Sequence, residues 1–226
     1  MSITRPWPQN FLPKLQAHLL PRVQQMLQCE VELQSSPYAQ SSRSVGIPSQ
    51  NDKPIVLIKN YQIYSHRLFR INYTTYDVRR AQDVINPRTP HHNIMLLAQS
   101  GSDEDHDANH HPFLYARVLG IYHANVVYVG PGMLDYNTRR FDFLWVRWYQ
   151  KLETRDPMGF KTYHLDQLSF PPMANEDAFG FVDPADVLRS CHIIPRFAKG
   201  RRYSDGVGLS KCARDSNDWK FYYVGR

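Results

Sequence analysis

Cysteine is scarce in this chain. Its 226 residues include three cysteines, Cys29, Cys191 and Cys212, which are far apart and odd in number. Secreted domains that depend on disulfides carry many cysteines, usually in even numbers. A chain of this length can bury a core without a disulfide or a structural metal. The cysteines therefore exclude a disulfide scaffold and predict a reducing compartment, the cytosol or the nucleus.

Long apolar runs and the common catalytic motifs are also missing. No run approaches the ~20 apolar residues that cross a membrane, and the first residues, MSITRPWPQNF, lack the apolar stretch of a secretory signal. The sequence contains no GxxxxGK[ST], GxGxxG, HExxH, GxSxG or CxxC. We therefore expect no membrane association, no cofactor, no metal and no recognised catalytic centre.

The composition is globular and carries an excess of positive charge. Hydrophobic residues make up 42%, and 27 Lys and Arg face 21 Asp and Glu, giving a pI near 9.2. A pI above ~9 is typical of nucleic-acid-binding domains, although such an excess also promotes solubility. Positive charge is concentrated near the end, where RFAKGRR follows Pro195 and contains no acid. We predict phosphate contacts for its four basic residues, Arg196, Lys199, Arg201 and Arg202.

The first 53 residues differ from the rest in composition and in hydrophobic pattern. Residues 1–33 are predicted to be a helical segment, because apolar residues recur every fourth position at Phe11, Leu15, Leu19, Val23 and Leu27. Prolines at positions 13 and 21 divide this pattern, which predicts two short helices near 12–20 and 21–28. Residues 34–53 are rich in Ser, Gln and Pro and are expected to form a flexible linker.

From residue 54 onward the sequence is rich in β-branched and aromatic residues. Strands are expected near residues 54–59, 61–73, 93–98, 113–129, 141–149, 178–182, 192–195 and 219–224. His123–Asn125 is expected to be a hairpin turn, and FDFLWVRWY is apolar on both faces, which favours an interior strand. Asp183 followed by Pro184 predicts the start of a short helix. The predicted fold is mostly β (α+β), a small antiparallel barrel or a partly open sheet, forming one domain over 54–226.

Five segments of the chain resemble a known group of proteins. They are YTTYDVRRAQDVINPRT (73–89), FLYARVLGIYHANV (113–126), FDFLWVRWY (141–149), FGFVDPADVLRSCHIIPRFAKGR (179–201) and ARDSNDWKFYYV (213–224). The group is a set of uncharacterised families of mushroom-forming fungi, encoded beside or within Plavaka-type and KDZ-type DNA transposons. The resemblance implies a mobile-element context and supplies no catalytic residues. Members continue beyond the FYYV segment, so a shortened or diverged copy is expected here.

A looser resemblance is to the bromo-adjacent homology (BAH) domain. The segments YARV (115–118), VRWY (146–149) and Asp183–Ile194 occur in the order of the corresponding BAH segments. BAH domains are β-barrels that bind histone tails, nucleosomes or other chromatin proteins. The resemblance implies a BAH-like core for residues 54–226 and a chromatin partner. We take Tyr115, Trp145 and Trp148 as candidates for an aromatic pocket in such a reader.

Aromatic and basic residues also alternate in two other stretches, 64–80 and 139–149. The first contains Tyr64, Arg67, Phe69, Arg70, Tyr73, Tyr76, Arg79 and Arg80, and the second contains Arg139, Arg140, Trp145, Arg147, Trp148 and Tyr149. Such residues bind nucleic acid through phosphate contacts and base stacking. Tyr and Trp are also good strand formers, and Arg stems cover sheet edges, so a structural role explains both stretches equally well.

Four further residue sets are candidates for chemistry. Asp142, on a strong strand, together with Asp166, Asp183 and Asp186 would suit a metal-dependent nuclease or transposase. The loop SDEDHDANHH (102–111) and the pair His91–His92 offer metal ligands, but a solvated loop explains them more simply. Cys191 and His192 are neighbours on a predicted strand and point to opposite faces, which favours a buried cysteine over a nucleophile.

The sequence thus favours a non-enzymatic module that binds chromatin or nucleic acid, as an accessory of a mobile element. We expect an intracellular protein, in the nucleus rather than the cytoplasm, with nucleic acid or chromatin proteins as partners. Two alternatives stay open at this point. One is a metal-dependent nuclease or transposase-related enzyme that uses Asp142, and the other is a protein-interaction remnant without chemistry.

Overall fold

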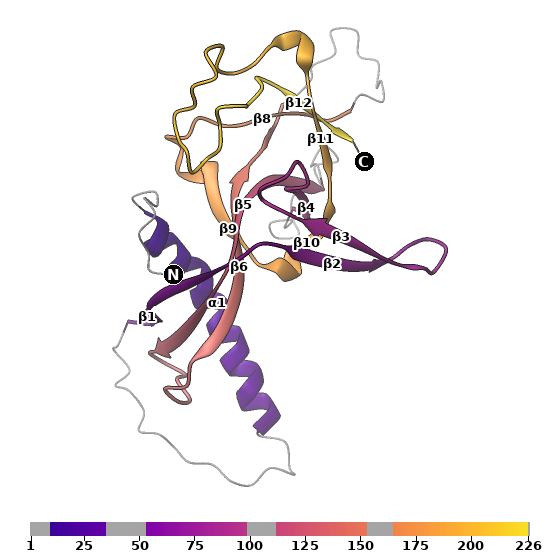
Figure 1. The fold of residues 1–226 in the computed structure, drawn as a ribbon. Helices are drawn as coiled ribbons and strands as arrows, with labels where there is room; N and C mark the ends of the chain where they lie inside the picture. The colour runs from indigo at the N-terminus through magenta and orange to yellow at the C-terminus, as the bar shows by residue number, and fades with distance from the viewer. Residues whose placement is uncertain (1–9, 35–52, 99–111, 153–164, 226) are drawn as a thin grey trace, which may run out of the picture. The chain divides into compact units, whose positions relative to one another are not determined.

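The computed structural model describes residues 10–34, 53–98, 112–152 and 165–225. Within these residues the protein is mostly β with one α-helix, and its sheets are open rather than closed into a barrel (Figure 1). The mostly-β prediction is therefore confirmed in its partly open form. The predicted linker lies almost entirely outside the described residues. Residues 1–65 with 122–142 form one compact unit, and residues 66–121 with 143–226 form the second, a division different from the single domain predicted over 54–226.

One continuous helix, α1 (Phe11–Gln34), replaces the two predicted short ones. Its buried side chains are Phe11, Leu15, Leu19, Val23 and Leu27, each no more than 6% exposed. Burying such a side chain stabilises a protein by about 1.5–3 kcal/mol, whereas an interior proline costs about 3 kcal/mol. The buried apolar residues lie both before and after Pro21. Their packing outweighs the cost of the proline, so the helix continues past it.

The first unit also contains β1 (Ile55–His66) up to Ser65, the end of β5 (Phe113–Val129) and the start of β6 (Arg139–Trp148). Gln16 on the helix donates to the Val56 carbonyl at 2.9 Å. Arg22 donates to the Asp142 carbonyl at 3.0 Å, and its guanidinium lies 5.4 Å from the centre of the Phe141 ring. These contacts join α1 to the strands of its unit. They occupy the Gln16 amide and the Arg22 guanidinium in hydrogen bonds within that unit.

The long strand β5 has no turn at His123–Asn125, which corrects the predicted hairpin. Burial alternates through this region: Ala124 and Val126 are buried, while His123 and Asn125 are half-buried. The two-residue period of a strand therefore continues without interruption. The polar residues that suggested a turn occupy the more exposed side of an unbroken strand.

The principal sheet has the order β10-β4-β5-β6-β9, and β1 also pairs with β5. Its remaining strands are β4 (Asn93–Leu97), β9 (Phe179–Val182) and β10 (Val187–Ser190). The prediction that FDFLWVRWY forms an interior strand is confirmed, because β6 lies between β5 and β9. In the second unit this sheet buries an aliphatic cluster that includes Ile94, Val118, Leu144 and Val146.

Two smaller sheets complete the second unit. One joins β2 (Phe69–Thr74) to β3 (Arg80–Ile85), and the other has the order β11-β12-β8-β7. The strands of the latter are β7 (Gln150–Lys151), β8 (Gln167–Ser169), β11 (His192–Pro195) and β12 (Tyr222–Gly225). The described part of this unit also contains the 3-10 turns η1 (Glu176–Ala178), η2 (Pro184–Asp186) and η3 (Phe197–Lys199). The predicted Asp183 cap is confirmed, since its side chain accepts from the Ala185 N–H.

A buried ion cluster links the end of the chain to the centre of the second unit. The carboxylate of Asp218 accepts from Arg117 of β5 at 2.6 Å and from Arg147 of β6 at 2.5 Å. Both guanidinium groups lie over the ring of Phe170, at 4.5 and 3.9 Å from its centre. Asp218 and Arg147 are fully buried. One buried anion thus compensates two buried cations.

The substitution Asp218→Asn should lower the free energy of unfolding by about 3–5 kcal/mol, because it leaves two buried guanidinium groups without a carboxylate. Urea denaturation at pH 7 measures this loss. Asp177→Asn, at an exposed acid of η1, is the matched control and should change stability by less than about 0.5 kcal/mol. Equal stability of the two variants would contradict the role of the cluster.

His92 lies beside this cluster and is half-buried. Its Nδ1 bonds to the Thr89 carbonyl. Burial, and then the charges of Arg117 and Arg214, lower the pKa of His92 from 6.5 to about 4. The folded protein therefore favours neutral His92.

This depressed pKa predicts a pH-dependent loss of stability. The contribution of neutral His92 is fully present above pH 6.5, the unfolded value, and is lost as pH falls towards 4. The full loss is about 3 kcal/mol. His92→Asn keeps a donor for Thr89 but cannot titrate in this range. Denaturation at several pH values should give the variant a flatter profile between pH 6.5 and 4, and parallel profiles would refute this assignment.

Candidate nucleic-acid interface

The predicted phosphate-binding segment forms a tight turn on the second unit. Arg196 precedes η3, and Gly200 ends it with φ +78°, where its N–H donates to the Phe197 carbonyl. This positive φ favours glycine. It reverses the chain so that Arg201 forms an antiparallel bridge with Trp219.

Backbone hydrogen bonds join this turn to the end of the chain. The N–H of Arg196 donates to Phe221 at 2.9 Å, and the N–H of Arg202 donates to the carbonyl of Asp218 at 2.8 Å. The N–H of Lys220 donates to Gly200 at 3.3 Å. The turn is therefore held by the same segment that carries the buried Asp218 carboxylate.

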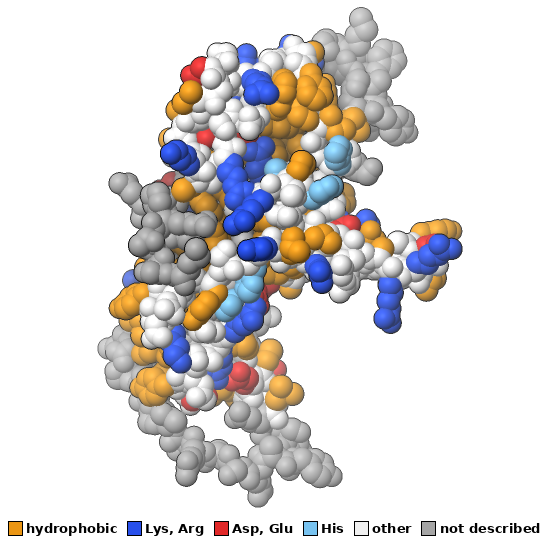
Figure 2. All heavy atoms as spheres, viewed as in Figure 1, with side chains coloured by type: hydrophobic (Ala, Val, Ile, Leu, Met, Phe, Trp, Pro, Cys, Tyr) orange, Lys and Arg blue, Asp and Glu red, His pale blue; other side chains and the backbone are white. Residues whose placement is uncertain are grey.

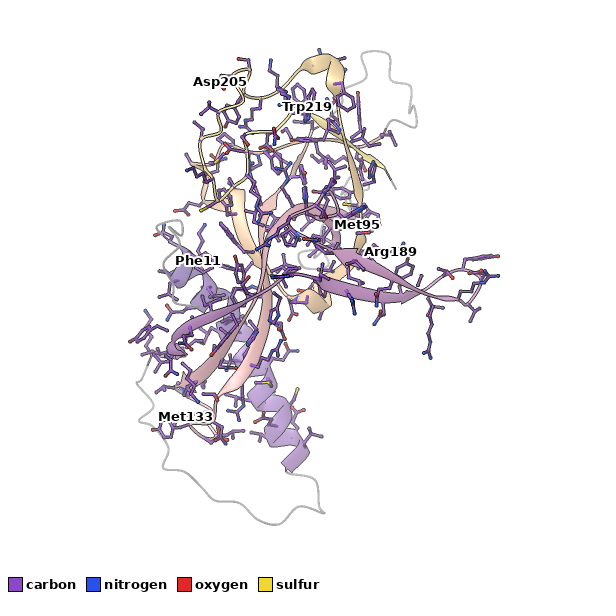
Figure 3. All side chains as sticks on the ribbon, viewed as in Figure 1. Phe11, Met95, Met133, Arg189, Asp205 and Trp219 are labelled. Atoms are coloured by element: carbon purple, nitrogen blue, oxygen red, sulfur yellow. The ribbon has the colours of Figure 1, made fainter. Side chains whose placement is uncertain are left out.

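Aromatic rings lie under the basic side chains here. The guanidinium of Arg201 is 5.5 Å from the centre of the Trp219 ring, and that of Arg196 is 5.7 Å from the Tyr223 ring. Phe197 meets Trp219 edge to face, with ring centres 4.9 Å apart (Trp219 is labelled in Figure 3). We define the basic–aromatic patch as Arg196, Phe197, Lys199, Arg201, Trp219, Lys220 and Tyr223.

The four predicted phosphate contacts differ in availability. Lys199 and Arg201 are exposed, and Arg201 has one long hydrogen bond, 3.5 Å, to Asn217. Arg196 is half-buried against Tyr223. Arg202 is half-buried and donates to the Phe170 carbonyl at 3.0 Å. Lys199 and Arg201 are thus best placed to meet a phosphate, whereas Arg202 also supports the fold.

Two carboxylates of this region point inward. Asp215 is 1% exposed and Asp218 is 0% exposed. Asp215 accepts the backbone N–H groups of Leu209 at 2.7 Å and Ser210 at 3.0 Å. Burial would raise the pKa of Asp215, but these hydrogen bonds lower it below its usual range. Asp215 and Asp218 therefore add no exposed negative charge to the patch, whereas Asp205 is exposed and accepts the Val207 N–H at 3.0 Å.

The residues proposed for an aromatic pocket lie in the protein interior. Tyr115 and Trp145 are 3% and 5% exposed. Tyr115 belongs to a buried cluster with Tyr149 and Tyr222. Trp148 packs partly buried against the aliphatic core, with its indole nitrogen so close to Gly180 that a Cβ there would lie 2.6 Å away. This arrangement offers no exposed aromatic cage built from the three residues.

The acidic residues considered for nuclease chemistry have structural partners. Asp142 accepts from Arg140 at 2.7 Å, and Asp166 pairs with Lys151 at 3.2 Å. Asp183 caps η2. Cys191 is half-buried between β10 and β11, and burial raises the pKa of its thiol to about 12. The His- and Asp-rich loop 102–111 lies outside the described residues.

The basic residues of stretch 139–149 also have internal roles. Arg139 donates to Glu30 at 2.6 Å and to Asp135 at 2.8 Å, and the hydrogen bond that it donates to Glu30 is the main reason that its pKa is raised. Arg140 pairs with Asp142, and Arg147 is buried against Asp218. The structural interpretation therefore holds for this stretch.

Sequence reasoning assigned Trp219, Lys220 and Tyr223 only to a final strand. The signal was the alternation of aromatic and basic residues in WKFYY, which repeats the pattern noted elsewhere in the chain. Comparison of the chain with family models, curated proteins and solved structures gives no match. Within the described residues, no helix has the length and apolar character needed to cross a membrane.

Proposed function

We propose that this protein is a non-enzymatic nucleic-acid-binding module and that the basic–aromatic patch is a contact surface. Lys199, Arg201 and Lys220 meet phosphates, and the ring of Phe197 stacks on a base. The observation that carries the proposal is the union of exposed cations with exposed aromatic surface: Phe197 is 64% exposed and lies beside Trp219. Grooves that bind single strands combine the same two elements.

Three features suggested by the resemblances stay predictions beside this proposal. They are a BAH-like core with a chromatin-protein partner, an association with mobile elements and a nuclear location. The patch is compatible with each, because chromatin and transposon ends both present nucleic acid. Among the acids weighed for the nuclease alternative, Asp142 pairs with Arg140, Asp166 pairs with Lys151 and Asp183 caps η2.

Salt dependence tests the phosphate contacts. Three contacts to a single strand should give a slope of log K against log salt of about −2, since each contributes about −0.7. Fluorescence anisotropy with an oligothymidine of about 20 nucleotides measures this slope. Lys199→Glu with Arg201→Glu should weaken binding about tenfold or more and flatten the slope to about −0.7.

The matched control is Lys53→Glu with Lys59→Glu, which changes the net charge equally at two exposed residues of the first unit. This control should retain the wild-type slope. Equal losses in the two double variants would show that net charge, rather than the patch, drives binding. Absence of binding by the wild type at 50 mM salt would refute the proposed function.

Phe197→Ala tests the stacking contact separately from charge. It should weaken binding to oligothymidine by roughly fivefold to a hundredfold, because base stacking on an aromatic ring contributes about 1–3 kcal/mol, while the salt slope stays unchanged. Leu209→Ala, at a side chain that is 77% exposed, is the apolar control and should bind like the wild type. Unchanged affinity of Phe197→Ala would remove stacking from the account.

A further inference from the structure

The strands β2 and β3 form a two-stranded antiparallel ribbon that pairs with no other strand in the described sheets. In Figure 1 it extends from the second unit to the right of the view. Directly opposite residues of an antiparallel pair lie on the same face. The register therefore sorts the ribbon into an inward and an outward face, which differ sharply in chemistry.

The inward face is anchored. Ile71 and Ile85 are buried. Asp83 accepts from the Arg189 side chain at 3.1 Å and from the Ser190 N–H at 2.9 Å. The Arg189 guanidinium lies 3.6 Å from the centre of the Tyr73 ring (Figure 3 labels Arg189 beside the ribbon). Burial would raise the pKa of Asp83, but its hydrogen bonds to Ser190 and Arg189 lower it. The inward face of the ribbon is thus attached to β10 through Asp83 and through the contact of Tyr73 with Arg189.

The outward face consists of three cross-strand pairs. They are Arg70 with Val84, Asn72 with Gln82, and Thr74 with Arg80, and all six residues are exposed. The face carries two guanidinium groups and two amides but no carboxylate. Gln82 donates to the Asn72 oxygen at 2.7 Å. The exposed carboxylate nearest the tip, Asp77, pairs with Arg79 at 2.9 Å.

These are the side chains that read base edges in duplex DNA. Arg donates two hydrogen bonds to guanine, Asn and Gln make paired hydrogen bonds with adenine, and the methyl group of Thr meets the methyl group of thymine. The major groove, about 12 Å wide, admits a two-stranded ribbon. From Arg70 to Thr74 the strand rises about 14 Å, the rise of about four base pairs.

We infer that the outward face of the β2–β3 ribbon binds the major groove of double-stranded DNA. Charge complementarity favours this occupant, since the face is cationic and, within the described residues of the ribbon, Asp77 is paired and Asp83 is turned inward. The view in Figure 2 shows blue basic side chains along the ribbon and at its tip. The inference deepens the proposed function by naming duplex DNA as a second ligand, on a surface separate from the basic–aromatic patch.

Binding to a random-sequence DNA duplex of about 20 base pairs tests this inference. Arg70→Gln with Arg80→Gln should weaken duplex binding about tenfold or more, because it removes two cations and their paired donors. Binding to oligothymidine should change less than about twofold. Arg88→Gln with Arg140→Gln, at two exposed arginines outside the ribbon, removes the same charge and should leave duplex binding within about twofold of the wild type.

The uncharged pair Asn72→Ala with Gln82→Ala separates base reading from phosphate attraction. Selection from a random duplex pool should enrich a short motif for the wild type and for the arginine control, whereas this variant should lose that enrichment and keep non-specific affinity within about twofold. Circular dichroism and urea denaturation confirm that each variant folds. Binding to double-stranded RNA should be weaker, because side chains cannot read its deep, narrow major groove.

Three results would overturn the inference. They are unchanged duplex binding by the Arg70 and Arg80 variant, equal loss in the arginine control, and retention of the binding motif without Asn72 and Gln82. Duplex binding that is insensitive to all ribbon variants would show that the ribbon does not contact DNA. An acidic protein would then be the occupant to test. The patch variants are tested on oligothymidine and the ribbon variants on duplex DNA. Either claim can therefore fail while the other stands.

Discussion

The bond between the Asp218 carboxylate and two guanidinium groups is the interaction on which the second unit depends. Its side chain joins Arg117 of β5 to Arg147 of β6, and its backbone carbonyl accepts from Arg202. One residue therefore fixes both the core strands and the turn that carries the exposed cations. Trp219 follows Asp218 directly, so the buried Asp218 also positions the Trp219 ring beneath Arg201. The position of a surface site thus follows from a buried anion.

The two candidate binding surfaces share one design. In each, carboxylates are turned inward and bonded to backbone N–H or guanidinium groups, which leaves the outer surface cationic. Asp215 and Asp218 do this behind the basic–aromatic patch, and Asp83 does it behind the ribbon. Net charge alone understates such surfaces, because it counts inward acids and outward bases equally. The distribution of charge, rather than its sum, decides what the protein attracts.

Local patterns were sufficient to predict several elements. The apolar runs of β6 and β4 and the Asp183 cap all depend on residues close in sequence, and they were found where expected. The continuous helix through Pro21 and the unbroken strand at His123–Asn125 were not predicted, because burial by distant segments outweighs a local break signal. The strands β3 (Arg80–Ile85) and β10 (Val187–Ser190) were also absent from the prediction, and β10 replaces the continuation of the short helix expected after Asp183.

The candidate sites show the same limit more strongly. Arg147 precedes Trp148 in the sequence, and Arg201 lies over the Trp219 ring. Arg147 is fully buried, whereas Arg201 is exposed. Only the strand neighbours decide which of them can meet a phosphate. The sequence drew attention to RFAKGRR and to the aromatic–basic stretch that contains the ribbon, and both stay predictions. It could not show that Phe197 and Trp219 lie together, since they are joined by pairing across a turn.

Hydrogen–deuterium exchange with and without nucleic acid tests the central claim most directly. A duplex with a single-stranded extension, in low salt, should slow exchange in residues 69–85 and in residues 196–202 with 218–225. The helix α1 should exchange at the same rate in both states, and it serves as the internal reference. Protection confined to other segments, or no protection while binding is measured independently, would contradict the account.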